Sequence, residues 1–230
     1  MRPFAGLCDY RCMQTLMFAA LALLGVNSLK ADILLYDNGG PDQGTGDEMT
    51  QLIQAEDFVL GANASISGVR FWALNSSPSA YQGSIAWAIG ADNGGVPGTI
   101  LASGSATATL TGTGNNVMID TQNLAEELVS FMIPEFSATS GTTYWLELHN
   151  GPIASSANSG FYWETSSSAP LGDANTGQQL SLPGAGFWGD TGNEHAYELT
   201  STPEPSSLFL LVTMIGIAVL TLRREKRAAR

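Results

Sequence analysis

Basic residues are nearly missing from the central part of this 230-residue chain. Arg70 is the only one of the nine Lys and Arg residues that lies within residues 32–202. Removing Asp9, Glu204 and Glu225 from the twenty-one acidic residues leaves eighteen in that segment, so its formal charge is −17. Nucleic-acid binding depends on clustered Lys and Arg side chains that neutralise phosphates. The charge distribution therefore excludes a nucleic-acid partner.

Cysteine is equally scarce, since the only two, Cys8 and Cys12, lie close to the N-terminus. Basic residues there precede an apolar run over residues 15–26, and small Ala31 follows it. This order is typical of a secretory signal peptide, and the run is shorter than the roughly 20 residues that span a bilayer. We therefore predict export of residues 32 onward by the general secretion machinery, with signal peptidase removing residues 1–31. Both cysteines would leave with the leader, which excludes disulfides and thiol chemistry in the mature chain.

A second apolar run covers residues 207–222, and five basic residues follow it. Sixteen helical residues reach roughly 24 Å, slightly less than the roughly 30 Å hydrocarbon core of a bilayer. The positive-inside rule places the basic tail in the cytoplasm and the preceding domain on the other side of the membrane. We therefore predict a marginal transmembrane helix with a cytoplasmic C-terminus.

A Pro-Glu-Pro motif precedes this apolar run, and a pair of arginines follows it. The residues of the pattern are Pro203, Glu204, Pro205, Arg223 and Arg224. Residues 201–230 thus resemble the PEP-CTERM sorting signal, although Thr202 stands where that family usually has a hydrophobic residue. The resemblance implies transit through the inner membrane, cleavage near the motif by an exosortase, and delivery to the outer surface or the extracellular matrix of a polysaccharide-producing bacterium. The alternative is a simple membrane anchor that contains the motif by accident.

Between these ends, short apolar runs alternate with period two and are separated by Gly, Asn, Asp, Ser and Pro. This pattern predicts half-buried strands. We expect an all-β antiparallel β-sandwich or jelly-roll-like domain over residues 32–200, flanked by the two terminal helices. Residues 123–127 are the only helix-like piece within it. We expect about ten strands, and the candidate segments for them are 33–36, 56–60, 66–74, 84–91, 100–103, 106–111, 116–120, 128–133, 143–149, 161–165, 179–182 and 196–200.

Several stretches of this domain resemble extracellular β-sandwich domains that precede PEP-CTERM tails and other surface anchors. The stretches are 55–60, 66–72, 91–98 and 142–146. Those domains are mostly of unassigned activity, so the resemblance implies an architecture and no catalytic residues. Together with the sorting signal, it predicts a secreted structural or adhesive surface protein.

Residues for nucleophilic catalysis are scarce. The chain has no Gly-x-Ser-x-Gly motif and only two histidines, His149 and His195, of which we expect the second in a solvated loop. Nothing in the sequence supports a Ser-His-Asp triad. With eighteen carboxylates in the segment, some pair at a glycosidase-like separation is expected by chance, so such a pair is no evidence for a glycosidase. We therefore predict that the protein is not an enzyme, with a polysaccharide-active hydrolase as the second alternative.

Five tryptophans favour carbohydrate binding as the main alternative function, because aromatic faces stack on sugar rings. Trp145, Glu147 and His149 alternate on the strand face opposite the apolar one, and Trp163 is followed by another carboxylate. These four residues are the candidate contacts to an extracellular polysaccharide. The competing interpretation is that the tryptophans fill the core, which we expect for Trp87.

Two further patterns involve oxygen-rich side chains. Asp37, Asp42 and Asp173 lie in Asp- and Gly-rich loops that suit calcium, but neither loop has EF-hand spacing and turn chemistry explains both. We expect no cofactor and leave structural calcium open. Threonines alternate over residues 107–113. Such a single row is more often a solvated strand face than an ice-binding array.

Overall fold

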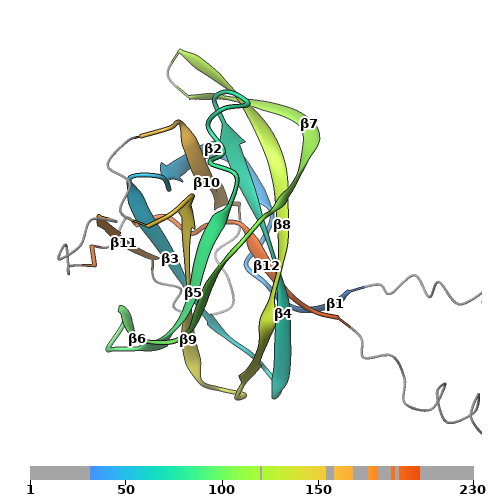
Figure 1. Cartoon of the computed structure of the whole chain (residues 1–230), viewed down its shortest axis with the longest axis vertical. Helices are drawn as coiled ribbons and strands as arrows, with labels where there is room; N and C mark the ends of the chain where they lie inside the picture. The colour runs from blue at the N-terminus through green and yellow to red at the C-terminus, as the bar shows by residue number, and fades with distance from the viewer. Residues whose placement is uncertain are drawn as a thin grey trace, which may run out of the picture. The chain divides into compact units, whose positions relative to one another are not determined.

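Twelve β-strands make up the described part of the chain, and every ladder between them is antiparallel (Figure 1). The computed structural model describes residues 32–119, 121–153, 158–167, 176–180, 188–189 and 192–202, with only the backbone for 176–180. The strands are β1 (Ile33–Asp37), β2 (Pro41–Glu48), β3 (Leu52–Val59), β4 (Ala64–Asn75), β5 (Ile85–Asp92), β6 (Pro97–Ala106), β7 (Thr109–Ile119), β8 (Gln122–Ala138), β9 (Thr143–Asn150), β10 (Phe161–Ser166), β11 (Thr176–Leu180) and β12 (Tyr197–Ser201). The all-β prediction is therefore confirmed for these residues.

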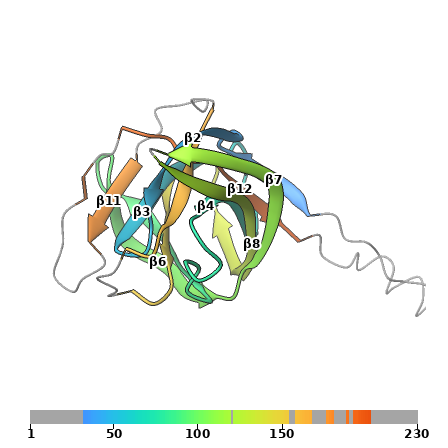
Figure 2. The same cartoon turned by 90° about the horizontal axis from the view of Figure 1, so that it is seen from above.

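The strands form two sheets in a sandwich-like arrangement (Figure 2). One sheet has five strands in the order β11-β3-β9-β5-β6. The other has seven and is organised around β4, which pairs with β8 along one edge. Its other edge pairs with β12 at residues 68–71 and with β10 at residues 73–75. Strands β7, β1 and β2 then extend this sheet from β8, β12 and β10.

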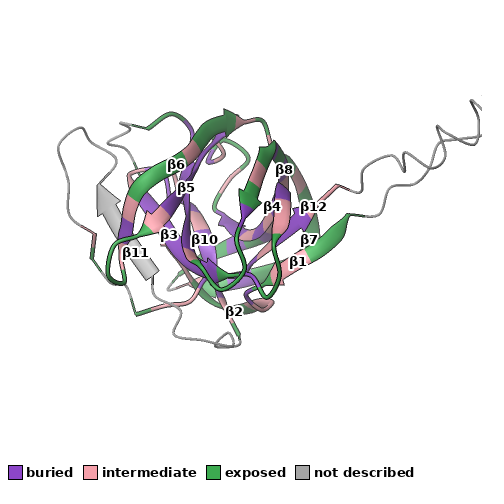
Figure 3. Cartoon of the chain, turned by 90° about the horizontal axis from the view of Figure 1, so that it is seen from below, coloured by how far each residue is buried: buried purple, intermediate pink, exposed green. Residues whose placement is uncertain are grey.

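The core lies between the two sheets and is rich in aromatic side chains. Phe58 of β3 stacks on Tyr144 of β9 with ring centroids 5.6 Å apart, and Trp87 of β5 is buried as expected. Phe71 of β4 meets Trp163 of β10 edge to face at 5.8 Å. Burying one such side chain contributes on the order of 1.5–3 kcal/mol. Figure 3 shows that β5 is largely buried and β6 mostly exposed. This difference is expected because β6 is the edge strand of the five-stranded sheet.

The structure corrects three local predictions. Residues 123–127 are not helical but belong to β8, because they pair with both β4 and β7. Residues 41–48, expected as a loop, form β2 through pairing with β10. The expected strand over 106–111 is divided, since β6 ends at Ala106 and β7 begins at Thr109. Partners distant in the sequence decide all three outcomes.

The first and last described strands lie side by side. In the β1–β12 ladder, Ile33 stands opposite Ser201. No helix in the described ranges is long and apolar enough to cross a membrane. The predicted signal peptide, residues 1–31, and the predicted transmembrane helix, residues 207–222, both lie outside those ranges.

Candidate functional site

All four residues nominated for glycan contact are buried. Trp145 and Trp163 have no exposed surface, and Glu147 and His149 keep only 6% and 1% of theirs. The predicted alternation along β9 is present, because Leu146 and Leu148 belong to the core cluster while Trp145, Glu147 and His149 take the opposite face. That opposite face is covered as well. Trp163 lies on β10 and belongs to the core cluster itself. None of the four side chains therefore presents a surface on which a sugar ring can stack.

Each of the two nominated tryptophans uses its indole N–H in a hydrogen bond within the fold. Trp145 donates from Nε1 to Oδ1 of Asp92 at 3.1 Å. Trp163 donates from Nε1 to the carbonyl of Ala196 at 3.0 Å. A buried indole N–H needs such a partner, so both rings are built into the fold through their one polar group.

Glu147 occupies space left by a missing side chain. A Cβ atom added to Gly90, its neighbour on β5, would lie 3.0 Å from Oε1 of Glu147. Burial raises the pKa of Glu147 to about 7. On the same face, His149 binds the carbonyl of Gly151 through Nδ1 at 2.9 Å.

The candidate calcium ligands have local roles where the structure describes them. Asp37 accepts the N–H of Gly39 at 2.9 Å, and Asp42 accepts the N–H of Gly44 at 2.7 Å. Within the described ranges, no group of three or more His, Cys, Asp or Glu side chains is arranged to hold a metal ion. Asp173 lies outside the described residues, as do the five sorting-motif residues, namely Pro203, Glu204, Pro205, Arg223 and Arg224.

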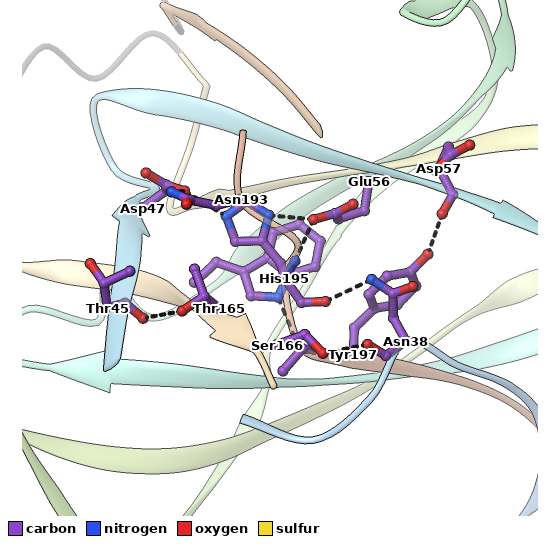
Figure 4. Close-up of polar contacts among 12 residues, drawn as sticks. Asn38, Thr45, Asp47, Glu56, Asp57, Thr165, Ser166, Asn193, His195 and Tyr197 are labelled. Atoms are coloured by element: carbon purple, nitrogen blue, oxygen red, sulfur yellow. Dashed lines mark hydrogen bonds and ion pairs between the residues drawn. The ribbon is translucent and has the colours of Figure 1, made fainter. Parts of the chain in front are cut away.

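A buried polar network centred on His195 is the feature that the sequence did not predict (Figure 4). His195 has no exposed surface, so the expectation of a solvated loop residue is wrong. Its Nδ1 lies 2.6 Å from Oε1 of Glu56, and its Nε2 lies 3.0 Å from Oδ2 of Asp47. The ring also stacks on Trp163 with centroids 4.7 Å apart. The imidazole is thus held between two carboxyl groups and an indole.

Burial and hydrogen bonding oppose each other at this network. Burial alone lowers the pKa of His195, but the hydrogen bonds to Asp47 and Glu56 outweigh it and raise that pKa to about 9. Burial raises the pKa of Glu56 to about 8 despite its bonds to His195. Burial also acts to raise the pKa of Asp47, but the hydrogen bond from His195 outweighs it and lowers that pKa. The folded network therefore binds more protons near neutral pH than the same residues do in the unfolded chain.

The network joins the two sheets. Glu56 lies on β3 of the five-stranded sheet, Asp47 lies on β2 of the seven-stranded sheet, and His195 lies two residues before the start of β12. Further bonds fix the same region: Asn38 donates to the carbonyl of His195 at 2.9 Å, and Tyr197 donates to the carbonyl of Asp57 at 2.8 Å. Both ring nitrogens are engaged and shielded from solvent. This geometry fits a cross-link between sheets rather than an acid or base that meets a substrate.

A comparison of the chain with protein-family models and with curated proteins gives no match.

Proposed function

We propose that the protein is exported and sorted by an exosortase to the cell surface or extracellular matrix, where its acidic β-domain has a structural or adhesive role. The order of the Pro-Glu-Pro motif, apolar run and basic tail carries this proposal. Its partners are then signal peptidase, the secretion machinery, the inner membrane during transit, and the exosortase. The proposal assigns the domain no catalytic role.

The extent of the described fold supports this interpretation. All twelve described strands lie between Ile33 and Ser201, inside the two predicted processing positions. Thr202, just before the motif, is still tied to β4: its N–H donates to Oγ of Ser67 at 2.8 Å, and the two hydroxyl groups lie 2.9 Å apart. Cleavage at either predicted position would therefore remove none of these strands.

The structure favours neither the hydrolase alternative nor glycan contact at Trp145. The described carboxyl groups with raised pKa values are Glu56, Glu147 and Glu164, and all three are buried. A glycosidase needs two carboxyl groups that reach the bond of a bound sugar. Display of the domain therefore remains the function that the sequence and the fold support together.

Replacing Pro203, Glu204 and Pro205 together with alanine should leave the protein in the inner-membrane fraction instead of outside the cell. An exosortase that recognises this motif would no longer cut, and the apolar run would stay in the bilayer. Cell fractionation followed by immunoblotting measures the distribution. The control is Ser206→Ala, a neighbouring substitution outside the motif, which should be exported as the wild type is. Equal export of the triple variant and the wild type would contradict the proposal.

A further inference from the structure

The outer face of the seven-stranded sheet carries an open groove with a volume of about 470 Å³. Val69 and Phe131 point into the core, so their neighbours Gly68, Arg70 and Ser130 face outward from β4 and β8. The volume lies within the range of about 300–1,000 Å³ that is common for ligand sites. The groove crosses several strands, which suits a segment of a polymer.

Small residues form the depression. A Cβ atom added to Gly68 would lie 2.4 Å from Oγ1 of Thr200 and 3.5 Å from the sulfur of Met132. Ser130 and Thr200 also line the groove, so three neighbouring strands have short side chains there. Met132 is 54% exposed and offers an apolar contact beside these short residues.

The groove contains the only basic side chain of residues 32–202. Nη2 of Arg70 lies 2.9 Å from Oδ2 of Asp32, and Nη1 lies 3.4 Å from Oε2 of Glu198. The Arg70 side chain is nevertheless 36% exposed, and a guanidinium has five N–H donors. Two carboxylates already neutralise this cation, and the domain around it is strongly acidic. An anionic ligand is therefore disfavoured.

Hydroxyl groups complete the lining. Thr107, Thr109 and Ser130 border the groove together with the Arg70–Asp32 ion pair. Each hydroxyl both donates and accepts, the guanidinium donates, and the carboxylate accepts. A ligand matched to this surface carries many groups of both kinds, has no net charge, and presents some C–H surface to Met132. Neutral sugars have all three properties.

We propose that this groove binds a segment of a neutral polysaccharide. The inference goes beyond display at the surface and does not depend on the sorting signal. It moves the carbohydrate contact from the buried face of β9 to the outer face of β4, β8 and the start of β7. Adhesion to a neutral matrix polymer would follow from it.

Titration calorimetry of the purified full chain tests this inference, in a detergent without a sugar headgroup. The probes are cellohexaose, laminarihexaose and mannohexaose, with hexagalacturonate as the charged comparison. We expect at least one neutral hexasaccharide to bind, with an affinity that changes little between about 0.05 and 0.5 M NaCl. Thr109→Val should weaken it about tenfold, because one hydrogen bond to the ligand is lost.

Thr111→Val is the matched control. Thr111 lies two residues further along β7 on the same outer face and is likewise exposed, but it does not line the groove. This variant should bind as the wild type does, and near-ultraviolet circular dichroism should show both variants folded. The proposal is overturned by no neutral binding up to about 10 mM, by tighter binding of hexagalacturonate, or by equal effects of the two substitutions. The localisation experiment above is independent of all these outcomes.

Discussion

Replacing His195 with alanine should lower the free energy of unfolding by about 3–5 kcal/mol, as expected when one partner of a buried charged network is removed. Near pH 6 the raised pKa of Glu56 keeps this buried carboxyl group protonated, so the substitution removes its hydrogen-bond partner, and it leaves the Asp47 carboxylate without its cation. It also removes the ring that stacks on Trp163. Urea unfolding of the domain near pH 6, followed by tryptophan fluorescence, measures the change.

His149→Ala is the control for this prediction. His149 is almost as buried, with 1% exposure, but its described hydrogen bond joins Nδ1 to a backbone carbonyl instead of a carboxylate. Its loss should cost about 1–3 kcal/mol, the range for a buried hydrogen-bonding group. A smaller cost for His195→Ala than for His149→Ala would contradict the role assigned to the network.

The domain should lose stability steadily as the pH rises from about 5 to 9. Burial raises the pKa of Glu147 to about 7 and that of Glu56 to about 8. Burial, together with the nearby charge of Glu126, raises the pKa of Glu164 to about 8. Burial acts to lower the pKa of His195, but hydrogen bonds to two carboxyl groups outweigh it and raise this pKa to about 9. Urea unfolding at a series of pH values tests this dependence.

The sign follows from proton binding. Where a folded pKa is raised, the folded state holds a proton that the unfolded state has released, so raising the pH favours unfolding. The window runs from the unfolded values, about 4.3 for Glu and 6.5 for His, to the folded values of about 7 to 9. Each proton contributes about 1.4 kcal/mol per pH unit. At low pH, the lowered pKa of Asp47 gives the opposite trend.

Glu147→Gln isolates one of these groups, because glutamine resembles the protonated carboxyl group. The variant should match the wild type in stability near pH 5 and exceed it near pH 8. Stability of the wild type that stays constant or rises between those pH values would contradict the account. The same protonation makes the charge of residues 32–202 near neutral pH less negative than the formal −17.

The period-two pattern predicted the central strands well. The segments 84–91 and 143–149 correspond to β5 and β9 with boundaries shifted by at most one residue. Both strands lie in the middle of a sheet, where the pattern of the strand itself dominates. Strand β2, with the sequence PDQGTGDE, has no such pattern and exists because β10 pairs with it. Local sequence does not contain that information.

The buried network was beyond prediction for a similar reason. Glu56 and His195 are separated by 139 positions in the chain, and no spacing rule connects them. Alternation along β3 places Glu56 on the same face as Phe58, which marks it as an inward-facing carboxyl group only once the sheet order is known. Trp145 is a similar case. Alternation predicted which face of its strand the side chain takes, but it did not predict that this face is buried.

The intact mass of the exported protein tests the central claim most directly. Sorting by a PEP-CTERM-type signal predicts a chain that begins near Asp32 and ends between Pro203 and Ser207, with the apolar run and basic tail removed. Mass spectrometry of protein collected outside the cell resolves both ends. Exported protein that still carries Arg230 would contradict the proposed processing.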